Sequence, residues 1–334
     1  MQSSASPTPA PLTPAPLPPA PPAPVQLNPA PLPAVPLPPA PLPGLTPPEL
    51  PAGPLLDFFR RNGRELPWRD PAAGPWGVLV SEIMLQQTPV ARVLDTYLSW
   101  MRRWPTPAHL SADSPGAAVR AWGRLGYPRR ALRLHAAATT ITSRHAGRIP
   151  SDLTQLLALP GVGEYTARAV AAFAFGARVP VVDTNVRRVL NRLINGTDDA
   201  GPATGEDRRL MESLLPAEPG VAALLSAAVM ELGALVCTAA RPRCADCPVR
   251  DSCRWTAAGR PVGTAARRVQ AWAGTDRQLR GRIMAVLRES EHPVPVDALR
   301  QLWPDRTQWQ RCLDSLLADG LLQRVDADRV SLPR

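Results

Sequence analysis

The sequence has 334 residues and a formal net charge of +10, and all 38 of its basic residues are arginine. A chain without lysine has no side-chain amine that can form a Schiff base with a sugar aldehyde, which excludes lysine-dependent lyase chemistry. No apolar run approaches the roughly 20 residues that span a bilayer, and the N-terminus lacks the pattern of a signal peptide, so we expect a cytoplasmic protein. The basic excess favours a polyanionic partner such as nucleic acid.

Residues 1–54 consist largely of Pro/Ala/Leu repeats. Proline fixes φ and removes backbone donors, so we expect a disordered, polyproline-rich tail that serves as a spacer, with a ligand for proline-binding modules as the alternative. The ordered chain is predicted to begin near Leu55 with a short amphipathic helix over residues 55–62.

Residues 77–87 are predicted to form a helix that carries one carboxylate among aliphatic side chains. Val78, Leu79 and Leu85 share the helical stripe of Glu82. Burial raises the pKa of a carboxyl group, as a general acid at neutral pH requires. The alternative is a buried glutamate whose charge is satisfied by backbone N–H groups or by an arginine.

Residues 90–150 are expected to be helical, with Trp100, Trp104 and Trp122 in the core. A glycine turn at residues 125–130 places Tyr127 beside two arginines. This combination suits stacking on a base, although an ordinary surface loop has the same composition.

The central stretch of the chain is a predicted helical hairpin. Residues 152–158, with Ser151 as a possible N-cap, and residues 164–175 are the expected helices, joined by a loop with Gly161 and Gly163. The second helix starts with backbone N–H groups that have no intrahelical partner, and such a terminus binds phosphate. An ordinary hairpin without a ligand is the alternative.

Asp183 follows an apolar run and is predicted to cap a helix over residues 184–194. Capping fixes the orientation of the carboxylate and favours its ionised form, so the same residue can cap and take part in chemistry. Capping alone is the alternative. Glu231, within an apolar helix over residues 221–236, is a second candidate for a partly buried carboxylate.

Four cysteines follow in a C-x6-C-x2-C-x5-C pattern: Cys237, Cys244, Cys247 and Cys253. Four thiolates at this spacing can enclose a metal centre. Structural zinc sites generally use two C-x2-C pairs, whereas this loop has one, so a [4Fe–4S] cluster is favoured over zinc. Cys312 stands apart from this group.

The last part of the chain has a different pattern. Three helices are predicted at residues 277–289, 296–302 and 307–317, followed by a hairpin of residues 321–325 and 329–332. This order suggests a winged-helix-like module over residues 275–334, which binds DNA, binds a protein or covers the rest of the chain.

Several motifs now occur together in one order. They are LPWR, SEIMLQQT, LGY, LPGVGEYTA, VVDTNVRRV and the four-cysteine loop. Together they resemble the helix-hairpin-helix DNA glycosylases with an iron–sulfur cluster, and within them the MutY family of adenine glycosylases. The resemblance spans residues 55–255, with the cluster loop at 237–253. It implies an all-α fold whose active site lies between two helical modules, and base excision repair by flipping a base and cutting its N-glycosidic bond.

The resemblance also implies roles for individual residues. Glu82 matches the acid that protonates adenine N7, Asp183 the carboxylate that stabilises the oxocarbenium-like sugar, and Asn185 a residue near that sugar. Arg69 and Glu231 match residues of the adenine pocket.

Other matched residues concern the DNA around the flipped base. Leu85 and Gln87 match residues that enter the gap opposite it, and Tyr127 one that wedges beside 8-oxoguanine. Gly161 and Gly163 match hairpin glycines at the phosphate, and the four cysteines match cluster ligands. The expected partner is duplex DNA with A:8-oxoG or A:G mispairs, bound by a nucleoid-associated monomer.

Tyr165 separates the branches of the superfamily. Endonuclease III-like members have a catalytic lysine at this position, so this chain resembles a monofunctional glycosylase. A thymine-mismatch glycosylase, which can also carry tyrosine here, and a non-catalytic metal-dependent DNA-binding protein remain alternatives.

Two departures from the family pattern concern the recognition of 8-oxoguanine. Pro128 replaces a second tyrosine that is common in the family, and the residues after Cys253 are too few for the Nudix-like domain of many members.

Overall fold

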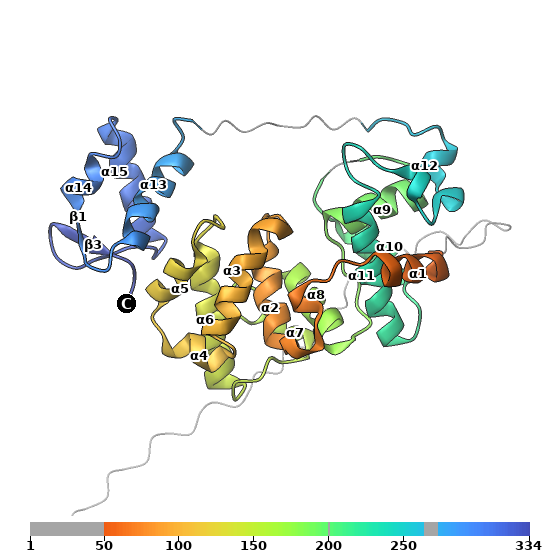
Figure 1. The fold of residues 1–334 in the computed structure, drawn as a ribbon, viewed down its shortest axis with the longest axis horizontal. Helices are drawn as coiled ribbons and strands as arrows, with labels where there is room; N and C mark the ends of the chain where they lie inside the picture. The colour runs from red at the N-terminus through yellow and green to blue at the C-terminus, as the bar shows by residue number, and fades with distance from the viewer. Residues whose placement is uncertain (1–49, 200, 264–272) are drawn as a thin grey trace, which may run out of the picture. The chain divides into compact units, whose positions relative to one another are not determined.

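The computed structural model describes residues 50–199, 201–263 and 273–334, and almost all of its regular structure is helical (Figure 1). The expected all-α fold is confirmed, with a small sheet near the C-terminus. Most of the expected disordered tail, residues 1–49, lies outside the described residues. No described helix is both long and apolar enough to cross a membrane.

The first helix begins earlier than expected. α1 spans Ala52–Asn62, so residues 52–54 belong to the helix and not to the tail. Pro54 is tolerated because the N–H groups of a first helical turn have no intrahelical acceptors in any case. Leu50 and Leu55 are buried, which anchors the start of the folded chain.

One group of helices packs around a tryptophan-rich core. Trp100, Trp104 and Trp122 are each at most 2% exposed, and Trp100 contacts the other two edge to face, which confirms them as core residues. The helices of this group are α2 (Gly74–Leu85), α3 (Val90–Arg103), α4 (Pro107–Ala112), α5 (Pro115–Trp122), α6 (Arg129–Arg144), α7 (Leu153–Leu157) and α8 (Glu164–Phe175).

A second core forms around α11 (Pro219–Leu235), along which α1 and α9 pack. α9 covers Thr184–Leu190 and passes into a π-helical turn, η3 (Asn191–Asn195), where a single α-helix was expected. The remaining elements are α10 (Gly205–Leu214), η4 (Cys244–Asp246), η5 (Arg250–Ser252) and α12 (Arg254–Ala257). α2 and α8 lie side by side, and α8 also contacts α11, so the two cores adjoin (Figure 1).

The C-terminal part contains the three expected helices and one strand more than expected. The strands form an antiparallel sheet in the order β1-β3-β2, with Val330 paired to both Val294 and Arg324. Its elements are α13 (Asp276–Glu289), β1 (Val294–Pro295), α14 (Val296–Arg300), α15 (Arg306–Ala318), β2 (Gln323–Arg324) and β3 (Arg329–Ser331).

This C-terminal part is attached to the tryptophan-rich group. The Gly116 N–H donates to the Pro333 carbonyl oxygen at 2.8 Å, and Arg129 forms an ion pair with Asp319 at 3.0 Å. A Cβ atom on Gly116 would stand 2.3 Å from that carbonyl, so only glycine allows this approach. α13 itself contacts α5, and the Arg120 side chain donates to the Arg288 carbonyl oxygen, so α13 lies beside the helix that leads into the LGY turn.

Candidate active site

Glu82 lies on α2 and is only 6% exposed, as the apolar stripe predicted. Burial raises the pKa of this carboxyl to about 7; a hydrogen bond from Tyr165 and the charge of Arg69 oppose the rise, and the carboxylate of Asp183 adds to it. These influences show that side chains from α2, α8 and the start of α9 meet at one place. Glu82 is therefore an acid that holds its proton near neutral pH.

Asp183 caps α9 as expected. Its Oδ1 accepts the Val186 N–H at 2.7 Å, and its Oδ2 accepts the Asn185 side-chain amide at 2.8 Å. Burial nevertheless raises the pKa of Asp183, against these hydrogen bonds and the charge of Arg188. The expected effect of the cap, which favours the ionised form, is thus opposed by desolvation.

Asn185 connects Asp183 to the cysteine loop. The Arg188 guanidinium donates to Asn185 Oδ1 at 2.7 Å, to the Gly233 carbonyl at 2.7 Å and to the Cys237 carbonyl at 2.6 Å. One arginine therefore joins α9, the end of α11 and the first cysteine of the loop. Sequence reasoning placed Arg188 on this helix without giving it a role.

Tyr165 lies on α8 and is partly buried. Burial, together with the carboxylates of Glu82 and Asp183, raises the pKa of its hydroxyl well above the usual value of 10. The hydroxyl therefore keeps its proton and donates to Glu82. The tyrosine hydroxyl is therefore a neutral hydrogen-bond donor beside the Glu82 carboxyl group.

Glu231 is fully buried and holds two arginines. Its Oε1 accepts the backbone N–H and Nε of Arg64 at 2.9 and 2.7 Å, and its Oε2 accepts Nη2 of Arg64 and of Arg69 at 2.9 and 2.8 Å. Burial alone would raise the pKa of Glu231, but these hydrogen bonds lower it to about 2. The prediction named Arg69 and missed Arg64, whose partner lies 167 residues away along the chain.

The helical hairpin has the expected form, with one difference at its first helix. Asp152, and not Ser151, caps α7, because its Oδ1 accepts the Gln155 N–H at 2.9 Å. Gly161 adopts a φ of 78°, and Gly163 is the exposed N-cap of α8. No side chain caps α8, so its first N–H groups are available to an anion.

The residues expected to enter the gap in the duplex lie near the end of α2 and at the LGY turn. Leu85 is partly buried, whereas Gln87 and Tyr127 are exposed and have left-handed φ values of 55° and 46°. Such values are uncommon for residues with a Cβ atom and persist only where neighbouring contacts enforce them.

Arg130 holds the backbone at the end of α2 and at the LGY turn in these conformations. It is buried and donates to the carbonyls of Met84 at 2.9 Å and Gly126 at 3.0 Å, and to the Thr88 hydroxyl at 2.9 Å. The end of α2 and the LGY turn are thereby held together. The Arg129-Arg130 pair was noticed in the sequence only as a source of charge.

The four predicted metal ligands, Cys237, Cys244, Cys247 and Cys253, lie in one loop, and three of them pack against the second core. Burial raises the pKa of Cys247 to about 11, and the charges of the other three thiols add to the rise. An all-sulfur donor set suits an iron–sulfur cluster or zinc. Over residues 50–199, 201–263 and 273–334, no three His, Cys, Asp or Glu side chains are close enough to hold a single ion.

Arg192 binds this loop to η3. It is 2% exposed, donates to Cys237 Sγ at 3.5 Å and to the Thr238 carbonyl at 2.8 Å, and stacks on Trp255 at 4.5 Å. Cys312 lies elsewhere, buried in the C-terminal part, as its isolation in the sequence indicated.

Comparison with known proteins agrees with this arrangement. Residues 80–217 match the model of the HhH-GPD superfamily of base excision DNA repair proteins. An adenine DNA glycosylase from Mycolicibacterium smegmatis is 52% identical over 279 residues, which cover 83% of this chain and 94% of the relative. The chain belongs to the adenine DNA glycosylase family. The predicted family and its class of enzyme, a hydrolase of N-glycosyl bonds in base excision repair, are thereby confirmed.

Other members and neighbours of the superfamily are more distant. The human adenine DNA glycosylase is 41% identical over 215 residues, 60% of this chain and 38% of the human protein. The solved structure of a thermostable thymine-DNA glycosylase has a TM-score of 0.56 at 26% identity, and the match covers 62% of this chain and 95% of that one. As a member of this family, the chain is a DNA-binding glycosylase.

Proposed function

We propose that this chain excises adenine mispaired with 8-oxoguanine or with guanine in duplex DNA, as a monofunctional glycosylase. The observation that carries the proposal is Glu82, a buried acid with a pKa of about 7, in the same site as Asp183. Glycosidic bond cleavage needs both an acid for the leaving group and a carboxylate for the positive charge that develops on the sugar.

In the proposed reaction, Glu82 gives its proton to adenine N7 as the bond between C1′ and N9 breaks. The bonding electron pair leaves with the base, and the Asp183 carboxylate stabilises the cationic sugar. Water then adds to C1′ and its proton returns to Glu82. The Asn185 amide and the Val186 N–H hold Asp183 toward the sugar.

Tyr165 and the absence of lysine support base removal without strand cleavage. The Tyr165 hydroxyl orients Glu82, and no side-chain amine is present to attack the sugar aldehyde that remains. The abasic product should therefore resist reductive trapping by borohydride, and its strand should break only after alkali or heat.

We infer that Arg69 contacts the flipped adenine and that Glu231 acts mainly by positioning it. Both carboxylate oxygens of Glu231 accept hydrogen bonds from Arg64 or Arg69. The positive charge of Arg69 also lowers the pKa of Glu82, so Arg69 lies near the acid. Such a pair delivers a fixed guanidinium to the base pocket.

The remaining matched residues concern the duplex. Leu85 and Gln87 would fill the gap left by the flipped base, and Tyr127 would stack beside the opposite base. Gly161 and Gly163 would bring the start of α8 to a phosphate, as supported by the exposure of Gly163.

The cysteine loop fits a [4Fe–4S] cluster held by Cys237, Cys244, Cys247 and Cys253. When bound, the cluster supplies four metal–sulfur bonds that stabilise the loop. Iron and acid-labile sulfide in the purified protein are the expected result, and a colourless protein that contains zinc would contradict the assignment.

We further propose the domain order expected from the sequence, with the end of the tail moved from residue 54 to the residue before Ala52, where α1 begins. A glycosylase domain then extends to residue 255 with its cluster loop at 237–253, and a winged-helix-like module covers residues 275–334. The order of helices and strands in α13 to β3 supports the last of these. The chain would act as a monomer on the nucleoid.

The decisive test is release of free base from duplexes with A:8-oxoG, A:G or T:G. Adenine release from the first two is expected; release of thymine from T:G alone would support the thymine-mismatch alternative. Glu82→Gln and Asp183→Asn should both abolish release, with the exposed Asp95→Asn of α3 as the control. Unchanged release by both site variants would favour a non-catalytic DNA-binding role.

A further inference from the structure

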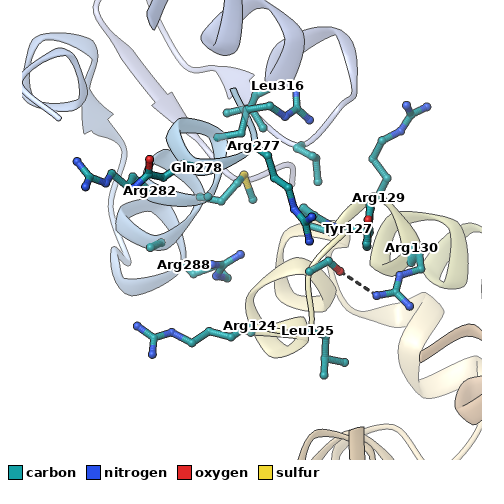
Figure 2. Close-up of a pocket in the computed structure, with 18 of the residues that line it drawn as sticks. Arg124, Leu125, Tyr127, Arg129, Arg130, Arg277, Gln278, Arg282, Arg288 and Leu316 are labelled. Carbon is teal, nitrogen blue, oxygen red and sulfur yellow. Dashed lines mark hydrogen bonds between the residues drawn. The ribbon is translucent and has the colours of Figure 1, made fainter. Parts of the chain in front are cut away.

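A cavity of about 1430 Å³ lies between the LGY turn and α13 (Figure 2), and its lining includes Gln87 after the end of α2 but not Glu82. Its described lining contains nine arginines and neither Asp nor Glu. Four of the arginines are on α13 and five are on the opposite wall, so two segments far apart in sequence supply one basic cavity. A concave surface lined by positive charges concentrates the electrostatic field and therefore favours an anionic ligand.

Two of these arginines are close enough to affect each other. Burial lowers the pKa of Arg288 on α13 and the positive charge of Arg124 from the opposite wall lowers it further, while the neighbouring Glu289 opposes the shift (Figure 2). Two of the nine lining arginines, Arg129 and Arg280, form ion pairs, and both pair with Asp319. Like charges held together are unfavourable until an anion neutralises them.

The cavity also reaches Tyr127. Arg277 of α13 lies over one side of the tyrosine ring, 5.4 Å from its centroid, and Arg130 lies 5.6 Å from it (Figure 2). The proposed function places this ring beside the base opposite the adenine. The basic cavity therefore begins where the duplex is expected to lie.

We propose that α13 and the LGY turn together bind the phosphate backbone of the DNA strand that carries the opposite base. This inference rests on the proposed function for the location of the duplex. Phosphate contacts come mainly from arginine and other hydrogen-bond donors, and this lining offers nine arginines and no carboxylate. The C-terminal part is then a component of the DNA interface that adds affinity but no sequence or lesion preference.

The test measures affinity for fluorescent duplexes by anisotropy, in the full-length Glu82→Gln protein so that the substrate stays intact. Arg288→Gln and Arg124→Gln should each weaken binding roughly fivefold or more and reduce the dependence of log Kd on log salt by about 1. The loss should be equal for an A:8-oxoG duplex and a fully paired duplex. Arg300→Gln, an equal charge change on exposed α14 outside the cavity, is the control.

Arg277→Gln, at an exposed position of α13, repeats the test without disturbing a buried group. Affinities within twofold of Arg300→Gln for all three variants, at every salt concentration, would overturn the proposal. A loss confined to the A:8-oxoG duplex would also overturn it, because it would indicate a base contact. The protein without any substitution is also assayed for adenine release. If it released no adenine while the arginine variants still bound DNA more weakly, the proposed function would be wrong but phosphate binding by the cavity would be supported.

Discussion

Gly233 of α11 lies so close to Asn185 that an added Cβ atom would stand 2.8 Å from the Asn185 Cβ and 2.9 Å from its carbonyl oxygen. Since Asn185 holds Asp183, Gly233→Ala should displace the carboxylate, slow base release and destabilise the protein by about 1–3 kcal/mol. Single-turnover kinetics and thermal unfolding measure the two effects. Alanine ordinarily strengthens a helix relative to glycine, which makes a net loss diagnostic.

Gly220→Ala on the same helix is the matched control. An added Cβ there meets only the Glu218 side chain at ordinary contact distance, 3.4 Å. Equal behaviour of the two variants would show that α11 and Asn185 are less tightly packed than the structure indicates.

The rate of base release should fall as pH rises through about 7, because the proton of Glu82 is lost there. Glu82→Gln should be slow at every pH. A rate that stays constant from about pH 6 to about pH 8 would argue against Glu82 as the acid.

The same group makes stability depend on pH. The folded pKa of Glu82 is above the unfolded value of 4.5, so its contribution is fully present below that value and is lost as pH rises through about 7. The loss is on the order of 3 kcal/mol. Glu82→Gln should therefore gain stability relative to the unmodified protein at about pH 9 but not at about pH 4, as urea denaturation can measure.

Arg64→Met should destabilise the protein by about 2–3 kcal/mol, because it leaves the buried Glu231 carboxylate with fewer charged donors. It should also release Arg69 from its fixed position and raise KM for DNA. Arg60→Met, at an exposed ion pair with Asp57 on α1, is the control and should cost less than about 1 kcal/mol. Equal losses would mean that the Glu231 cluster contributes no more than a surface pair.

Substitution by alanine should have different effects on stability at the two hairpin glycines. Gly161 has a φ of 78°, and an added Cβ would stand 2.6 Å from the Arg133 Cβ, so Gly161→Ala should destabilise the fold by more than about 1 kcal/mol. Gly163 has free space around the added Cβ, so Gly163→Ala should fold normally. If the α8 terminus approaches a phosphate, Gly163→Ala should still weaken DNA binding; unchanged affinity would place the phosphate elsewhere.

Features determined by neighbouring residues could be predicted from the sequence. Gly176 ends α8 where expected, with its φ of 68°, and Asp183 caps α9. The apolar stripe around Glu82 correctly indicated burial. In each case the decisive interactions lie within a few positions along the chain.

Features that depend on distant contacts could not be predicted. Arg64 meets Glu231, and Arg130 holds the end of α2, across separations of 167 and 46 residues. Nothing in the local pattern distinguishes these arginines from the many others in a lysine-free chain. The choice of Asp152 over Ser151 as the cap was local, but the two positions offer equivalent side-chain acceptors.

The single guanidinium of Arg188 connects the cysteine loop to Asp183, which in the proposed reaction stabilises the sugar, although the guanidinium itself bonds neither the sugar nor Asp183. It bonds the Cys237 carbonyl and the Asn185 side chain together, and Asn185 in turn holds Asp183. A shift of the loop backbone reaches the reacting carboxylate through two side chains. Oxidative injury to the cysteines would therefore appear first as slower lesion removal by a protein that is still folded, and only later as loss of the protein itself.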